Sequence, residues 1–264
     1  MQLSFAFRET WLHRVNPGVK LLASVALFAM VLFTHNVNVM MYLTAGTILC
    51  LLLLTGHPMK RILLYTSPFL LIFISSATGM MMFGEGTTTW FRYGIIHVTE
   101  ESFFRGIHLG FRALQVASVG LLFSLTTRPV ALFYSLMQQW KVPPKYAYSF
   151  LAALRMIPTL IEEFQTLRHA LKVRGRKKRN LLTSWYTTLR MYSIPLLAQS
   201  IRRAHRTAVA MEAKRFSVGK QRTYYYHIRY SPVDIWYALS IALLLTLSYL
   251  CGHVLPFTAI TDVR

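Results

Sequence analysis

Five apolar runs, each close to the length of a membrane-spanning helix, decide most of what this chain can fold into. They cover about residues 19–33, 39–54, 62–83, 106–125 and 233–250. A tilted helix needs about 20 residues to cross about 30 Å of hydrocarbon. The sequence therefore predicts an all-α polytopic membrane protein with about five transmembrane helices.

Polar and turn-forming segments separate these runs. Asn16-Pro17-Gly18 has turn chemistry and stands directly before the first run, so we expect it to fix where the chain enters the membrane. Residues 34–38 form a polar break. Residues 84–101 read as a polar loop that carries three glutamates and one arginine.

The net charge of +20 is concentrated in one region of the chain. Residues 128–230 hold 20 of the 29 Lys and Arg but only three of the nine Asp and Glu. The positive-inside rule places the N-terminus and this region in the cytoplasm. We therefore expect three parts: residues 1–127 with four spans, the basic region 128–230, and residues 231–264 with the fifth span and a short outer tail. A positive surface beside a membrane predicts contact with anionic lipids.

One arginine lies within the fourth apolar run. A charged side chain is costly in hydrocarbon, so Arg112 should either face protein or reach outward to the membrane edge.

The basic region contains two passages with helical periodicity that look like variants of each other. Each has a proline near its predicted start, Pro158 in the first and Pro195 in the second. Apolar residues recur at spacings of three and four in both, at Leu154, Ile157, Ile161, Phe164, Leu167 and Leu171, and at Leu197, Ile201, Ala204, Ala208 and Met211. This spacing predicts a pair of long coupling helices, each with one apolar face, that lie along the membrane surface or pack on each other.

The two predicted helices end in similar short clusters. The first ends at Val173, Arg174 and Gly175, and the second at Ala213, Lys214 and Arg215. A small residue beside an arginine lets another protein approach closely while the guanidinium pairs with a carboxylate. The alternative is an ordinary helix end, where a cation is favoured by the helix dipole.

These features together resemble the transmembrane T component of energy-coupling factor (ECF) transporters, which import vitamins and metal ions into bacteria. The resemblance covers nearly the whole chain. It rests on four segments that look like family motifs: Leu12 to Leu22, Thr126 to Pro129, Leu154 to Pro158, and Pro195 to Ala213.

The resemblance implies a non-catalytic subunit in the inner membrane of a bacterium. Two ABC ATPase subunits would each receive one helix end, and a small membrane S component would bind the cargo. The family's Ala-Arg-Gly signatures would fall at residues 173–175 and 213–215. The first has Val173 in place of alanine, and the second has Lys214 in place of arginine and Arg215 in place of glycine. Lys214 and Arg215 therefore both remain candidates for the cation that contacts the second ATPase subunit.

Other functions fit the sequence less well. Glu100, Glu101 and His108 resemble signatures of CAAX-type intramembrane proteases, but they fall in one stretch instead of on separate helices. A self-contained transporter would have charged or broken helices at mid-membrane on several spans. Nucleic-acid binding is not expected, because aromatic residues do not alternate with the basic ones. The sequence has no phosphate-binding loop and no metal-ligand spacing, so neither a cofactor nor a metal is predicted.

Overall fold

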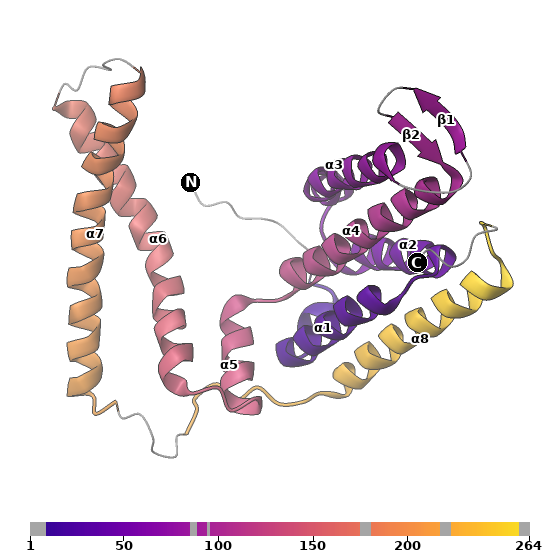
Figure 1. The fold of residues 1–264 in the computed structure, drawn as a ribbon. Coiled ribbons are helices and arrows are strands. Elements are labelled where there is room, and N and C mark those ends of the chain that lie inside the picture. The colour runs from indigo at the N-terminus through magenta and orange to yellow at the C-terminus, as the bar shows by residue number, and fades with distance from the viewer. Residues whose placement is uncertain (1–8, 85–88, 94–95, 175–180, 217–222, 259–264) are drawn as a thin grey trace. The chain divides into compact units, whose positions relative to one another are not determined.

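The computed structural model describes residues 9–84, 89–93, 96–174, 181–216 and 223–258 (Figure 1). In chain order the elements are the 3-10 helix η1 (Trp11–Arg14), α1 (Pro17–Phe33), α2 (Val37–Leu54), α3 (Met59–Phe83), β1 (Thr89–Tyr93), β2 (Ile96–Thr99), α4 (Glu100–Thr126), α5 (Pro129–Gln139), α6 (Pro144–Val173), α7 (Leu181–Ala213) and α8 (Pro232–Val254).

The prediction of an all-α polytopic membrane protein is confirmed. The five apolar runs correspond to α1, α2, α3, α4 and α8. Within the described residues, four helices are long and apolar enough to cross a membrane, namely α2, α3, α4 and α8. The first predicted span, α1, is a shorter apolar helix of 17 residues.

The structure differs from the sequence prediction in three places. The segment predicted as a polar loop contains an antiparallel β-hairpin, in which β1 pairs with β2 from Thr89↔Thr99 to Tyr93↔Ile96. Its sequence is rich in β-branched and aromatic residues, which favour strands. A separate helix, α5, precedes the basic helices. Pro158 and Pro195 lie inside α6 and α7 instead of near their starts, because both helices begin earlier than predicted.

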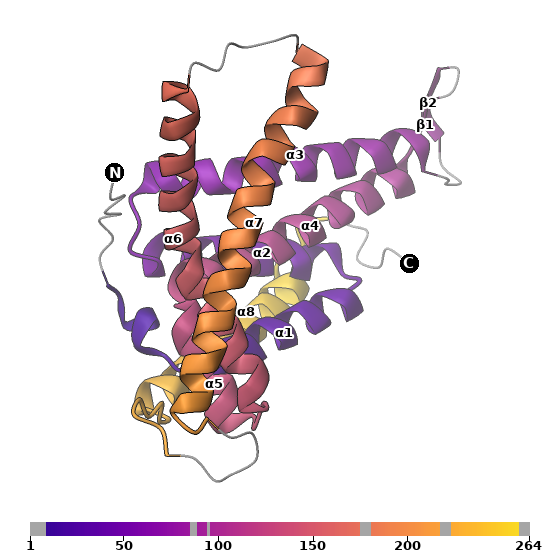
Figure 2. The same ribbon diagram turned by 90° about the vertical axis from the view of Figure 1, so that its left-hand side faces the viewer.

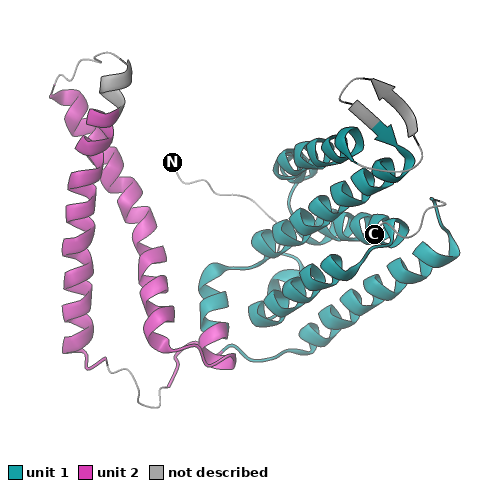
Figure 3. Ribbon diagram, in the orientation of Figure 1, with its two compact units in different colours: residues 1–135, 228–264 teal, residues 136–227 magenta. Residues whose placement is uncertain are grey.

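The chain divides into two compact units (Figure 3). Unit 1 contains residues 1–135 and 228–264, and unit 2 contains residues 136–227. Unit 2 is thus an insertion into unit 1, which holds all the apolar helices. That residues 128–230 are cytoplasmic stays a prediction.

Within unit 1, α4 packs against α1, α2 and α3. Its contact with α3 depends on small residues. A Cβ built at Gly106 would lie 2.7 Å from the carbonyl oxygen of Ala77, and one at Gly110 would lie 2.9 Å from the ring of Phe73. Gly106 and Gly110 are four residues apart, which is the spacing that lets two membrane helices approach closely.

The short α1 ends at Phe33, and at about 1.5 Å per residue its 17 residues span only about 25 Å. The guanidinium of Arg112, from α4, donates a hydrogen bond to the carbonyl of Thr34 just beyond this end, at 3.2 Å. Arg112 thus satisfies a carbonyl that the end of α1 leaves without a helical partner. Of the two alternatives that the sequence left open for Arg112, contact with protein is the one observed.

A buried side chain, Asn38, binds the chain after α8 at the start of α2. Asn38 is fully buried, and its Oδ1 accepts hydrogen bonds from the backbone N–H groups of Phe257 and Thr258 at 3.0 Å each. Its Nδ2 donates to the carbonyl of Thr258 at 3.2 Å. This amide therefore supplies the partners that the irregular tail cannot find within itself.

Replacing Asn38 with leucine is expected to free this tail and lower stability. Two backbone N–H groups would lose their acceptor, and an unpaired buried donor costs about 1–3 kcal/mol. We expect a lower Tm in detergent and fast hydrogen exchange at Phe257 and Thr258. Thr258→Val is the matched control, because it removes only the hydroxyl bond to the same oxygen. Unchanged exchange in the leucine variant would show that Asn38 does not hold the tail.

Candidate functional site

The first predicted docking cluster lies at the end of α6. The side chain of Val173 is 87% exposed, and Arg174 is exposed beside it. Arg174 is the first residue after the helix, and its N–H donates back to the carbonyls of Ala170 and Lys172. Its backbone is thus fixed by the helix end while its side chain faces outward. Gly175 lies outside the described residues.

The second predicted cluster ends α7 in a Schellman motif. The N–H of Phe216 donates to the carbonyl of Met211 at 2.9 Å, and the N–H of Arg215 donates to that of Glu212 at 2.8 Å. This pair of bonds requires a left-handed residue at the position after the cap, and Arg215 has φ of 56°. Glycine is the usual residue there, because a Cβ makes this conformation unfavourable.

The two ends therefore correspond residue by residue. Arg174 and Lys214 each stand directly after the last helical residue, Val173 and Ala213 respectively. Arg215 stands where the first cluster has Gly175. By position in the helix end, Lys214 is the equivalent of Arg174, and Arg215 is a non-glycine residue in the turn.

The left-handed conformation of Arg215 gives a direct stability prediction. Arg215→Gly should stabilise the end of α7 by about 1 kcal/mol, because the left-handed conformation costs a residue with a Cβ about that much. The measurement is hydrogen exchange at the amides of Arg215 and Phe216 together with the Tm. Lys214→Gly is the control and should destabilise the same end, since position 214 does not need this conformation. Faster exchange in the position-215 variant would contradict this account of the turn.

The helices α6 and α7 pack on each other as an antiparallel pair (Figures 1 and 2). Arg203 of α7 forms an ion pair with Glu163 of α6. The rings of Phe164 and Tyr192 lie 5.1 Å apart. Of the two arrangements left open by the sequence, packing on each other is therefore the one observed.

The pairing shows which side of α7 faces α6. Its predicted apolar face points away from α6, with Leu197 63% and Ile201 60% exposed. Arg203 lies on the side of α7 that is turned toward α6, where it pairs with Glu163. The apolar face of α7 is thus uncovered in the isolated chain.

The two cationic ends lie at opposite ends of this helix pair (Figures 1 and 2). A helix of 30 residues, the length of α6, is about 45 Å long. The ring of Phe216, next to the second cluster, stacks edge-on against Tyr148 near the start of α6, with centroids 5.7 Å apart. One protein surface of ordinary size therefore does not contact both ends, whereas two separate partners can.

A buried polar junction lies in unit 1, where two of the sequence motifs meet. The ammonium of Lys20, in the motif at residues 12–22, donates to the carbonyl of Thr126 at 2.9 Å. Thr126 is the last residue of α4 and begins the motif at residues 126–129. Lys20 is only 2% exposed. A buried cation at the C-terminus of a helix is favoured by the helix dipole.

Asp234, in the first turn of α8, completes this junction. Its Oδ1 accepts from the N–H of Asn16 at 2.7 Å, and its Oδ2 accepts from the N–H of Ser231 at 2.7 Å. The Oδ1 of Asn16 in turn accepts from Gly18 N–H and from the hydroxyl of Ser135, both at 2.9 Å. Sequence reasoning missed Asp234 and Ser135. The available signal was the Ser231–Asp234 capping box before the fifth span.

The segment before α1 is fixed to the end of α2. The hydroxyl of Thr10 donates to the carbonyl of Leu54 at 2.5 Å and lies 2.9 Å from Nδ1 of His13. Burial, and then the nearby charge of Lys20, lower the pKa of His13. This imidazole is therefore neutral at pH 7 and adds no further cation next to Lys20.

The positions of Glu100, Glu101 and His108 do not support the hypothesis of an intramembrane protease. Glu100 and Glu101 lie in the first turn of α4, and His108 lies two turns further along the same helix. At about 1.5 Å per residue, Glu101 and His108 are about 10 Å apart along the axis, too far to activate one water together. His108 instead lies by the end of α1, beside Arg112 and Thr34. Among the described residues, no group of His, Cys, Asp and Glu is arranged to hold a metal ion.

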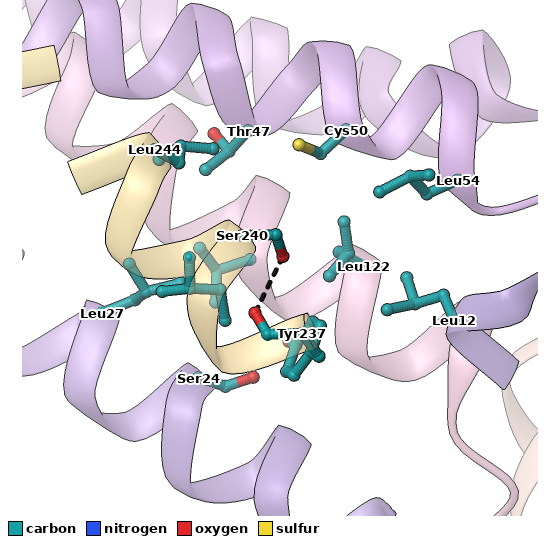
Figure 4. Close-up of a pocket in the computed structure, with 12 residues that line it drawn as sticks. Leu12, Ser24, Leu27, Thr47, Cys50, Leu54, Leu122, Tyr237, Ser240 and Leu244 are labelled. Atoms are coloured by element: carbon teal, nitrogen blue, oxygen red, sulfur yellow. Dashed lines mark hydrogen bonds between the residues drawn. The ribbon is translucent and has the colours of Figure 1, made fainter. Parts of the chain in front are cut away.

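A small apolar cavity lies between α1, α2, α4 and α8 (Figure 4). Its volume is about 50 Å³, and none of the described residues that line it is charged. The hydroxyl of Ser240 in its wall donates to the carbonyl of Tyr237 and so is already bonded. Sites for small-molecule ligands usually have about 300–1,000 Å³ and a few convergent polar groups. This cavity is therefore not suited to a polar cargo.

Comparisons with known proteins agree with one another. The family model described as Cobalt transport protein (CbiQ) matches residues 8–225. The proteins named "Energy-coupling factor transporter transmembrane protein EcfT" include one from Lactococcus lactis that is 28% identical over 93% of this chain and 95% of its own length. Another, from Lacticaseibacillus paracasei, is 26% identical over 90% of this chain and 92% of its own. A third, from Streptococcus equi, is 29% identical over 81% of this chain and 82% of its own.

Proposed function

Because this chain belongs to the CbiQ family of cobalt transport proteins, we propose that it is the transmembrane coupling subunit of an ECF-type ABC importer. In this role it binds two ABC ATPase subunits and a small membrane S component that carries the cargo. It is a transporter subunit and hydrolyses no ATP itself. The cargo is a vitamin or a metal ion, and the complex lies in the inner membrane of a bacterium.

The observation that carries this proposal is the placement of two exposed cations. Arg174 and Lys214 occupy the same position at two helix ends, and these ends lie at opposite ends of one helix pair. Each offers a positive charge fixed on a rigid helix to an acidic groove of a partner. Two equivalent contacts on one rigid element suit a pair of homologous partners such as two ATPase subunits.

The mechanism follows from the rigidity of α6 and α7. ATP-driven closure of the ATPase pair shifts the two docking points relative to each other, and the helix pair converts this shift into a movement of its apolar surface. The S component is proposed to rest on apolar surface such as Leu197 and Ile201, which the chain itself leaves uncovered. Its reorientation then releases the cargo. This is rigid-body coupling between distinct sites.

Orientation and lipid contacts complete the proposal. The positive-inside rule places the N-terminus and residues 128–230 in the cytoplasm. The excess of Lys and Arg in that region favours anionic lipid headgroups as additional contacts.

The test is to purify the full chain from its native membrane and identify what remains bound. We expect two ABC ATPase subunits, or two copies of one, together with a small membrane protein, and ATP hydrolysis that depends on the ATPases. A chain that purifies alone and takes up substrate when reconstituted alone would instead be a self-contained transporter. That result would overturn the proposed function.

A further inference from the structure

Arg112 is a cation within the apolar helices of unit 1, and no carboxylate among the described residues compensates it. Its guanidinium donates to the carbonyl of Thr34 at 3.2 Å, and its side chain stays partly exposed. The ion pairs of the described chain do not include it. A charge removed from water is costly unless an opposite charge lies near it. Arg112 therefore requires an anionic partner.

Two buried nitrogen atoms at the same place have no hydrogen-bond partner among the described residues. They are Nε of Arg112 and Nε2 of His108. His108 is 5% exposed, precedes Arg112 by one turn of α4 and lies beside it. Nearly all buried polar atoms of native proteins bond to protein or to a bound molecule. Water would satisfy these two nitrogens, but it would leave the charge of Arg112 uncompensated.

The guanidinium lies at the depth where α1 ends. Thr34, whose carbonyl it binds, is the first residue after this helix. The end of a helix that crosses the hydrocarbon lies near the lipid headgroups, and long cationic side chains extend toward them. A headgroup phosphate is therefore within reach of Arg112. In the proposed orientation, this end of α1 lies in the outer leaflet.

Exposed apolar side chains flank Arg112 on both helices. On α4, Leu109 is 39% and Val116 is 36% exposed, and their helical spacing places them on the same side as Arg112. On α1, Phe33 directly precedes Thr34 and is 80% exposed. A free phosphate ion gains nothing from such a surface. A phospholipid can lay its acyl chains there while its phosphate contacts the guanidinium.

We propose that Arg112 binds the phosphate of an anionic phospholipid of the outer leaflet. A guanidinium pairs with a phosphate through two parallel N–H···O bonds, and Nε is one of the donors that the protein leaves without a partner. Nε2 of His108, in the tautomer that carries its proton there, donates a further bond to the same phosphate. The carbonyl of Thr34 orients the guanidinium through Nη2. This lipid site requires neither ATPase partners nor cargo.

The test uses the full chain in lipid nanodiscs that contain equal amounts of phosphatidylglycerol and phosphatidylcholine. Both lipids carry a phosphodiester, but the choline of the second neutralises its charge. A photo-crosslinking amino acid replaces Phe33, and mass spectrometry identifies the lipids attached after irradiation. The same amino acid at Leu71 of α3 is the control. Leu71 is 68% exposed, and the nearby Phe73 contacts Phe111, so position 71 lies at a similar depth.

We expect phosphatidylglycerol to exceed phosphatidylcholine about fivefold at position 33 and to equal it at position 71. One basic residue at an anionic headgroup gives about this preference. Arg112→Gln should abolish the excess, and Arg112→Lys, which keeps the charge but not the planar donors, should retain part of it. Lys60→Gln removes an exposed cation from the start of α3 and should change nothing. The Tm in phosphatidylcholine alone shows whether each variant is folded.

Each other occupant of the site gives a different result. Equal labelling by the two lipids at position 33 of the parent, or an unchanged excess in Arg112→Gln, would overturn the lipid site. Loss of the excess on addition of inorganic phosphate would assign the site to a free phosphate ion. An excess that appears only after deletion of residues 259–264, which include Asp262, would assign it to a carboxylate of this chain. A protein crosslinked at position 33 in native membranes, in place of lipid, would assign it to a partner subunit.

Discussion

Replacement of both Arg174 and Lys214 by alanine is expected to release the ATPase subunits from the purified complex. Each cation is exposed at the end of a long helix, where it can form a charge-assisted bond to a partner carboxylate. Such a bond contributes about 1.5–3 kcal/mol, so each single change should weaken ATPase binding by about ten- to hundredfold. With both contacts gone, no ATPase should remain bound during purification.

Matched variants separate a docking cation from general positive charge. Arg168→Ala and Arg206→Ala remove exposed arginines from the bodies of α6 and α7 and should leave ATPase binding close to the parent value. Arg215→Gly should also retain binding, because we assign the second contact to Lys214. If Arg215→Gly releases the ATPases while Lys214→Ala does not, the second contact belongs to Arg215. If the alanine pair co-purifies with ATPases at the parent level, neither end is a docking point.

The second large effect is expected at the contact between α3 and α4. In Gly106→Leu, the new Cβ would lie 2.7 Å from the carbonyl oxygen of Ala77 and from Cγ of Met81. The carbonyl belongs to a helix backbone and cannot move aside as a flexible side chain can. Overpacking of this kind costs about 3 kcal/mol or more, so most of the protein should be lost or aggregate in detergent. Size-exclusion chromatography and Tm provide the measurement.

The same helix offers a control for this prediction. A Cβ at Gly120 would meet nothing within 4 Å, so Gly120→Leu adds the same volume to α4 without a clash. It should fold and elute like the parent. If both variants behave alike, the cost comes from leucine in α4 in general and the close packing at Gly106 is not responsible.

The sequence predicted the membrane part of the fold well, because apolar length is a local property. All five predicted spans correspond to helices, although α1 is shorter than a full span. The need of Arg112 for a polar environment was also predictable, since an arginine in hydrocarbon requires a polar partner. Its actual partner, the carbonyl of Thr34, depends on where α1 ends and was not predictable.

Features that depend on contacts between distant residues escaped sequence reasoning. The junction joins Asn16 to Asp234, which lie far apart in the chain. The apolar residues of α7 do form one face of the helix. Their spacing did not reveal that α6 packs on the opposite face, where Arg203 lies. The left-handed conformation of Arg215 could be seen only in the backbone of the structure. Because of this turn, Lys214 is the counterpart of Arg174.

We propose that each of the two helix ends contacts an ATPase subunit. The direct measurement places a photo-crosslinking amino acid at Val173 in one variant and at Ala213 in another, and then irradiates native membranes. We expect each position to form a crosslink to an ABC ATPase subunit. Crosslinks only to lipid, or to a protein other than an ATPase, from both positions would contradict it.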